Sequence, residues 1–259
     1  MPAELLASRH DHTLVLTLSD PAAMNALHPD MYAAGVETLE TAERDDSLRA
    51  IVLTGAGSAF CGGGNLNRLM ENRAKDRAVQ ADAIDRLHDW IAAIRDCSKP
   101  VIAAVEGNAA GAGFSLALAC DLIVAAHSAR FAMSHVKLGL SPDGGGSWFL
   151  SHALPRQLAT EMLLAGDAFT AERLHQAGIV NRVVTDGSAL DAALAWGDRI
   201  AELSPQACMN IKALLRDAPS NSLQQHFEAE KQRFVDSLYH RDGLEGISAF
   251  IEKRKAQFK

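Results

Sequence analysis

Short runs made almost wholly of apolar residues constrain the fold of this chain more than any other feature. The clearest is Val101-Ile-Ala-Ala-Val105, which offers no polar side chain to face water. A strand of this kind is buried on both faces, as in parallel sheets that helices cover on each side. Further short runs, rich in β-branched or aliphatic residues, lie at residues 13–18, 51–53, 122–126 and 179–184. The chain therefore contains five candidate strands.

Amphipathic helical patterns separate these runs and then take over the chain. Pro29 suits the first turn of a helix, and apolar residues recur at helical spacing between Ile84 and Ile94. This alternation predicts an α/β fold with largely parallel strands. After residue 188 the strand patterns stop, and we expect helices at residues 191–203, 207–215, 223–238 and 244–255. We therefore divide the chain into a core, residues 1–200, and a helical C-terminal region for oligomerisation, residues 201–259.

The composition excludes several classes of protein. With 48% hydrophobic residues over 259 positions, the chain can fold around a full core. Its net charge of −7 disfavours binding to nucleic acid. Neither a secretory leader nor an apolar run long enough for a membrane helix is visible, so we expect a cytoplasmic protein without membrane contact. The cysteines at positions 61, 97, 120 and 208 lack CxxC spacing, which favours free thiols.

Two glycine-rich turns carry the functional information. Each follows an apolar run, the first over residues 54–64 and the second over residues 106–115. Neither matches a nucleotide-binding loop, because Phe60 stands where a dinucleotide fingerprint needs its third glycine and no Gly-Lys-Ser/Thr occurs. We therefore expect neither NAD nor ATP. The second turn opens a helix, where backbone N–H groups hold negative charge, so the two turns together predict a two-donor oxyanion hole.

Four segments also match the motifs of a known family: residues 20–27, residues 59–66, residues 99–115 with 119–124, and residues 138–146. Through them the chain resembles the crotonase, or enoyl-CoA hydratase/isomerase, family over nearly its whole length. The resemblance implies a spiral of ββα units with a helical C-terminal trimerisation region. It also implies an acyl-CoA substrate, of which coenzyme A is a part, and assembly into a homotrimer or a hexamer of two trimers. We expect no redox or metal cofactor, since His10-Asp-His12 has no third ligand nearby.

The resemblance assigns roles to the residues of both turns. The backbone N–H groups of Gly62 and Ala112 would hold the thioester oxygen and stabilise the enolate that forms when a proton leaves the α-carbon. The CoA moiety would lie along a loop formed by Met24, Cys61, Gly62, Gly64, Asn65 and Leu66. Asn65 stands where the family usually has aspartate. The acyl tail would contact Leu69, Met70, Leu87, Trp90 and Ile91.

The acid/base group is the point at which the chain departs from hydratases of the family. Those enzymes use two glutamates, and Ser115 and His135 stand at the matching positions here. Asp143, in Pro142-Asp-Gly-Gly, resembles instead the single acidic residue of enoyl-CoA isomerases and of phenylacetate-pathway members of the family. One carboxylate suffices for a 1,3-proton shift. The resemblance thus favours isomerisation of a double bond, with Asp143 as the acid/base.

The sequence leaves several alternatives open for these residues. Asp143 precedes a glycine-rich helix start, where aspartate is commonly an N-cap, and a lone histidine such as His135 is commonly structural. Asp143 and His135 together would serve a 2-enoyl-CoA hydratase in fatty-acid or aromatic-acid catabolism. Ser115 and His135 would serve a thioester hydrolase, although the turn around Ser115 lacks the Gly-x-Ser-x-Gly elbow.

Overall fold

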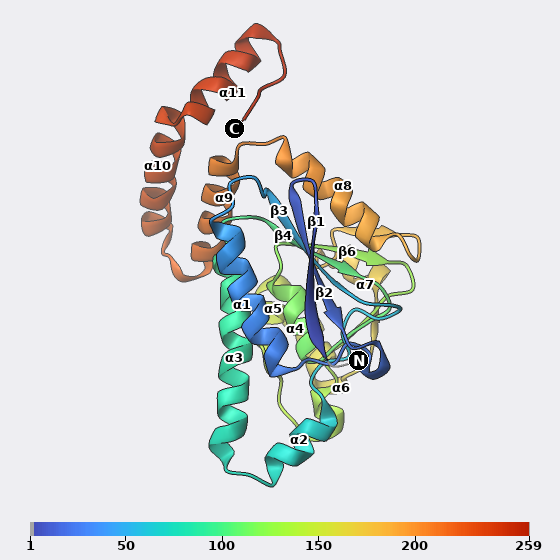
Figure 1. Cartoon of the computed structure of the whole chain (residues 1–259). Coiled ribbons are helices and arrows are strands. Elements are labelled where there is room, and N and C mark those ends of the chain that lie inside the picture. The colour runs from blue at the N-terminus through green and yellow to red at the C-terminus, as the bar shows by residue number, and fades with distance from the viewer. Residues whose placement is uncertain (1–2, 259) are drawn as a thin grey trace.

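A computed structural model describes residues 3–258 and contains a six-stranded sheet in the order β1-β2-β3-β4-β6-β9 (Figure 1). Its strands are β1 (Glu4–His10), β2 (Thr13–Ser19), β3 (Ala50–Gly55), β4 (Val101–Val105), β6 (Leu122–Ala126) and β9 (Arg182–Val184). β1 pairs antiparallel with β2, and every later pair in this sheet is parallel. The prediction of a largely parallel sheet is confirmed.

Both faces of the central strands are buried, because successive side chains of a strand point to opposite sides. The covering helices are α1 (Pro29–Glu43), α3 (Arg77–Asp96) and α8 (Ala189–Ala201). Ile51 and Leu53 belong to a cluster that includes residues of α1 and α3. Val52 and Ile102 face the other way and pack with residues of α8. Figure 1 shows α1 and α3 on one side of the sheet and α8 on the other.

A second, three-stranded sheet holds the second glycine-rich turn. Its strands are β5 (Asn108–Ala110), β7 (Arg130–Ala132) and β8 (Phe169–Thr170), in the order β5-β7-β8. The turn after β5 leads into α4 (Ala112–Ala119). The remaining helices of this part are α2 (Leu66–Arg73), α5 (Gly146–Ala153), α6 (Arg156–Ala165) and α7 (Ala171–Gln176). The first turn thus follows β3, and the second follows β4 and includes β5. Because β3 and β4 are neighbours in the large sheet, the two turns lie close together.

The last three helices form an arm at one edge of the molecule (Figure 1). They are α9 (Pro205–Asp217), α10 (Leu223–Tyr239) and α11 (Arg241–Glu252). Together with α8 they confirm the four predicted helices, and their ends differ from the predicted ones by at most three residues. The Nζ atom of Lys212 ties α9 to the core, since it donates to Ile94 O at 3.0 Å and to the Asp121 carboxylate at 2.6 Å. The division at residue 200 stays a prediction.

Five strands differ from the sequence-based expectation. Three of them, β5, β7 and β8, are not predicted because each is only two or three residues long. β1 is not predicted at all, because it is an edge strand whose side chains are mostly exposed. The expected strand at residues 179–184 is shorter, because the N–H groups of Ile179 and Val180 both donate to Leu174 O of α7 and so do not join the sheet.

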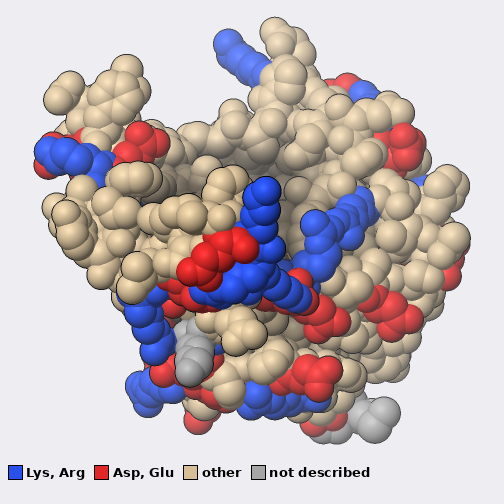
Figure 2. All heavy atoms as spheres, turned by 90° about the horizontal axis from the view of Figure 1, so that it is seen from above, with Lys and Arg blue, Asp and Glu red and all other residues tan. Residues whose placement is uncertain are grey.

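The surface carries charges of both signs. On the face seen in Figure 2, basic and acidic side chains are intermingled. Within residues 3–258, no helix is both long and apolar enough to cross a membrane. In the same range, no three His, Cys, Asp or Glu side chains gather closely enough to hold a metal ion.

Candidate functional site

A cavity of about 490 Å³ lies between the two glycine-rich turns, the helices α1, α2 and α3, and the segment from Ser134 to Asp143. The two turns contribute backbone to its wall, including Gly64 and Ala112. The helices contribute mainly apolar side chains, among them Leu69 and Leu87. A concave, largely apolar site with a few polar groups is typical of small-molecule binding.

The two turns are joined directly by backbone hydrogen bonds. The N–H of Cys61 donates to Asn108 O at 2.9 Å, and the N–H of Ala110 donates to Cys61 O at 2.9 Å. Gly113 packs so closely against this junction that an added Cβ would lie 2.6 Å from the Cys61 Sγ atom. The turns therefore hold each other in a fixed relation at the cavity wall.

The oxyanion hole predicted from Gly62 and Ala112 needs a correction. The N–H of Gly62 already donates to Met24 O at 2.7 Å, so it is not available to a ligand. Gly64 and Ala112 both line the cavity, and neither N–H has a hydrogen-bond partner among residues 3–258. Ala112 is the first residue of α4, where an N–H has no acceptor within its own helix. Gly64, predicted only as part of the CoA loop, thus offers the free donor that Gly62 does not.

The other residues of the predicted CoA loop lie in different environments. Gly64, Asn65 and Leu66 line the cavity, and their contact with CoA stays a prediction. The Oδ1 atom of Asn65 accepts N–H bonds at the start of α2, which is the N-cap role that aspartate also performs. Cys61 is fully buried, and burial raises the pKa of its thiol to about 12, so the prediction that it faces CoA is wrong. Met24 lies outside the cavity wall with its side chain 55% exposed, and contact with CoA stays a prediction.

The predicted acyl-tail contacts are only partly in the cavity wall. Leu69 and Leu87 line it, but Met70, Trp90 and Ile91 do not. Met70 is 68% exposed, and Trp90 is fully buried in the core. Helical periodicity places residues on a common face and does not reveal where along that face a cavity opens.

Asp143 lies in the cavity wall beside His135. Its Oδ1 atom is 3.1 Å from the Nε2 atom of His135, whose side chain is nearly buried. The Nδ1 atom of His135 is buried and has no hydrogen-bond partner in the described part of the chain. Asp143 does not cap α5, since the N-cap residue is Gly145 and no side chain caps this helix. Both residues are thus turned toward the cavity and toward one another.

Ser115 has a different place from the one that the hydrolase alternative requires. It is fully buried and does not line the cavity. Its hydroxyl donates to the backbone carbonyl of Asp143 at 2.9 Å, and no hydrogen bond joins it to His135. A serine nucleophile needs an exposed hydroxyl next to its base. The prediction of a catalytic Ser115 is therefore wrong, and the residue positions the loop that carries Asp143.

Two side chains in the cavity wall, those of Tyr32 and Arg68, were not predicted from the sequence as site residues. Tyr32 of α1 is nearly buried, and that burial, reinforced by the negative charge of Asp143, holds the pKa of its phenol well above the usual range. It therefore stays protonated and can donate a hydrogen bond. Arg68 of α2 contributes a positive charge to the same wall. Neither belongs to a recognisable motif, because a tyrosine and an arginine on amphipathic helices usually indicate packing and solvation.

Comparison with known proteins gives concordant results. The family model described as enoyl-CoA hydratase/isomerase matches residues 9–259. The chain is 38% identical to 2,3-dehydroadipyl-CoA hydratase of Escherichia coli, over 99% of each chain. It is 35% identical to 1,2-epoxyphenylacetyl-CoA isomerase of the same organism, over 95% of this chain and 94% of the relative.

Solved structures agree with these relatives. An enoyl-CoA hydratase from Polaromonas sp. JS666 superposes with a TM-score of 0.98 at 50% identity, over 99% of this chain and all of that one. The expected crotonase-like fold is thereby confirmed. Together with the cavity and its paired turns, these likenesses show that the chain belongs to the enoyl-CoA hydratase/isomerase family and is an enzyme of the lyase or isomerase class.

Proposed function

We propose that the protein moves a double bond within an enoyl-CoA thioester, with Asp143 as the single acid/base. The observation that carries this proposal is the composition of the cavity wall. Among the described residues of that wall, Asp143 supplies the one carboxylate, and Gly64 and Ala112 supply N–H groups without partners. A single carboxylate can move a proton between two carbons of one molecule when the intermediate anion is stabilised.

The reaction begins with the thioester oxygen at the N–H groups of Gly64 and Ala112. Asp143 takes a proton from C2 of a 3-enoyl thioester, and the electron pair of the broken C–H bond passes into a dienolate whose charge falls on that oxygen. The protonated Asp143 then returns the proton to C4, which leaves the double bond between C2 and C3. Each backbone donor of such a hole typically contributes about 3 kcal/mol to stabilising the intermediate.

His135 has a positioning role in this scheme. Its Nε2 atom lies 3.1 Å from one oxygen of Asp143, which leaves the second oxygen of the carboxylate for the substrate proton. Ser115 fixes the backbone of the same loop through its bond to the Asp143 carbonyl. Asp143 is therefore held by one hydrogen bond to its side chain and one to its main chain.

Water addition to a 2-enoyl-CoA is the second candidate, and the His135–Asp143 pair is the observation that favours it. Two polar groups 3.1 Å apart at one wall can bind a water molecule and share its proton transfers. Two of the relatives named above are hydratases. In this alternative Asp143 and His135 together replace the pair of carboxylates used by other hydratases of the family.

Product analysis separates the two candidates. We expect a 3-enoyl-CoA to give a product of unchanged mass in ordinary water, with solvent deuterium entering the product in heavy water. A hydratase acting on a 2-enoyl-CoA gives a product heavier by one water, and a thioesterase releases free CoA. Mass spectrometry of single-turnover reactions reads all three outcomes. If only the hydrated product formed, the isomerase proposal would be wrong.

We also propose that copies of the chain assemble through the helical arm into a trimer or a pair of trimers. α10 has no buried residue in the single chain. Four apolar side chains of α10 and α11 are more than 40% exposed, namely Phe227, Phe234, Leu238 and Phe250. Phe250 is 86% exposed. Apolar side chains gathered in this way mark an interface. We expect light scattering to give at least three times the chain mass of 27.7 kDa, and a monomer at micromolar concentration would contradict this.

A further inference from the structure

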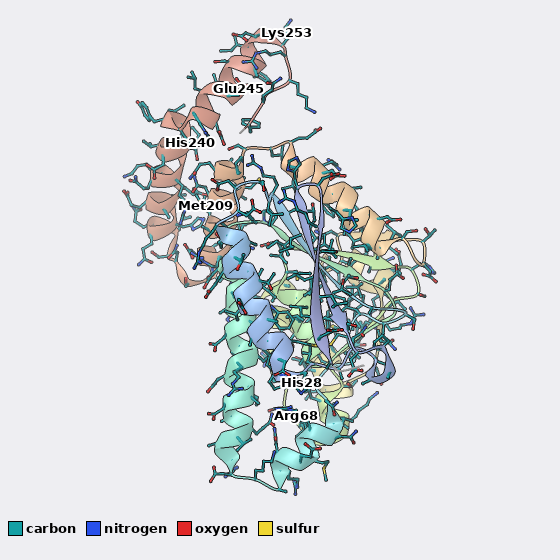
Figure 3. The ribbon with its side chains drawn as sticks, viewed as in Figure 1. His28, Arg68, Met209, His240, Glu245 and Lys253 are labelled. Atoms are coloured by element: carbon teal, nitrogen blue, oxygen red, sulfur yellow. The ribbon has the colours of Figure 1, made fainter. Side chains whose placement is uncertain are left out.

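Arg68 is the feature of the cavity that the proposed reaction does not use. It extends from α2 into the wall, and its Nε atom is buried and has no hydrogen-bond partner among residues 3–258. Its Nη1 atom lies 2.9 Å from the Nε2 atom of His28, the N-cap residue of α1. In Figure 3 the two labelled residues lie side by side, below α1 and at α2. The contact fixes the direction of the guanidinium group.

Within residues 3–258, the charge of Arg68 is compensated only indirectly, through His28. An arginine N–H only donates, so the Nε2 atom of His28 accepts this hydrogen bond. The Nδ1 atom of the same ring lies 3.2 Å from the carboxylate of Asp30, which is exposed and on the other side of the imidazole from Arg68. No carboxylate of residues 3–258 lies within ion-pair distance of Arg68. The other cation of the wall, Lys137, does pair, with Asp167 at 2.7 Å. A partly buried guanidinium without a directly paired carboxylate is costly, which indicates that its direct partner is a ligand.

Arg68 lines the same cavity as Tyr32 and as Asp143, the proposed acid/base. The charges of Arg68 and Asp143 act in opposite directions on the pKa of the Tyr32 phenol, which Asp143 raises and Arg68 lowers. Beyond Arg68 the wall continues with a polar pair, in which Asn72 donates to Gln80 at 2.9 Å. The part of the cavity wall that α2 forms thus includes polar and positively charged side chains.

We propose that Arg68 binds a carboxylate at the far end of the acyl group, so that the preferred substrates are CoA thioesters of dicarboxylic acids. The fork of guanidinium N–H groups matches the two oxygens of a carboxylate. His28 holds the group in place before the ligand arrives, which lowers the entropic cost of binding. This inference rests on the proposed function for the identity of the thioester.

The test is a binding measurement and requires no turnover. Calorimetry compares succinyl-, glutaryl-, adipoyl- and suberyl-CoA, each with the unsubstituted acyl-CoA of the same chain length. We expect at least one dicarboxylic ligand to bind about 10- to 100-fold more tightly than its partner, the usual worth of a charged hydrogen bond. Equal affinity of the wild-type protein for both members of every pair would overturn the proposal.

Variants of Arg68 test whether this side chain causes the tighter binding of dicarboxylic ligands. Arg68→Met should abolish the preference for the dicarboxylic ligand and leave the unsubstituted acyl-CoA unchanged, whereas Arg68→Lys should retain part of it. Arg73→Met is the matched control, because Arg73 is an exposed cation of the same helix outside the cavity wall. If Arg68→Met weakened both ligands and free CoA equally, Arg68 would bind a CoA phosphate, and the proposal would be wrong. Failure of the isomerase assay alone leaves these results intact.

Discussion

Asp143→Asn should lower the turnover of a 3-enoyl-CoA by about 10²- to 10⁴-fold, the usual contribution of a positioned general acid/base. The substitution keeps the size and shape of the side chain, so the fold and the affinity for acyl-CoA should change little. The measurement is single-turnover kinetics, with thermal unfolding and ligand binding measured on the same preparation. Nearly full activity of the variant would remove both the isomerase assignment and the role given to Asp143.

Variants of the neighbouring residues serve as controls for this result. Ser115→Ala removes only the hydroxyl that holds the Asp143 carbonyl, and His135→Gln removes the imidazole that positions the carboxylate. Both should cost much less than Asp143→Asn, since neither group moves the proton. A larger loss in His135→Gln than in Asp143→Asn would shift the acid/base role to the imidazole.

Gly113→Ala should reduce turnover by about 10²-fold although position 113 touches neither substrate nor proton. The new Cβ would lie 2.6 Å from both the Cβ and Sγ atoms of Cys61, so the two turns must move apart. A misplacement of about 1 Å at a catalytic site commonly costs this much. The same overpacking should destabilise the fold by about 1–3 kcal/mol. Kinetics and denaturant unfolding measure the two effects.

A matched glycine gives the opposite expectation. Gly246 lies in helix α11, and a Cβ there would meet its nearest atom, in Phe258, at 3.5 Å, which is an ordinary contact. Gly246→Ala should leave activity unchanged and should not destabilise the protein, because alanine favours helix over glycine. If Gly113→Ala behaved in the same way, the close junction of the turns would not control the geometry of the donors.

The strands and helices were predictable where the pattern of burial is strong. Val101–Val105 is apolar throughout and is buried throughout, so its sequence and its place in the sheet agree. β1 has no such pattern, since an edge strand that faces water leaves no periodic trace. The arm was predictable from helical periodicity, because α10 and α11 keep an apolar face even though that face is exposed in the single chain.

The sequence predicted which segments form the site. It did not predict which hydrogen bonds and packing contacts their residues make. The sequence indicated two glycine-rich turns with backbone donors, but glycine spacing does not show which N–H is already bonded. Only the bond from Gly62 to Met24 O separates Gly62 from Gly64. In the same way, the burial of Cys61 and the meeting of Arg68 with His28 depend on how distant segments pack. Such contacts leave no signal in the neighbouring residues.

The proposed oxyanion donors are main-chain groups, whereas the proposed acid/base is a side chain. The two parts of the site therefore respond differently to mutation. No codon change deletes a peptide N–H, except one to proline, so the capacity of Gly64 and Ala112 to hold a negative oxygen tolerates many substitutions. The fate of the resulting anion depends instead on side chains such as Asp143 and His135, which single codon changes can replace. Descendants of such a chain can therefore acquire new reactions while they keep the same reactive intermediate.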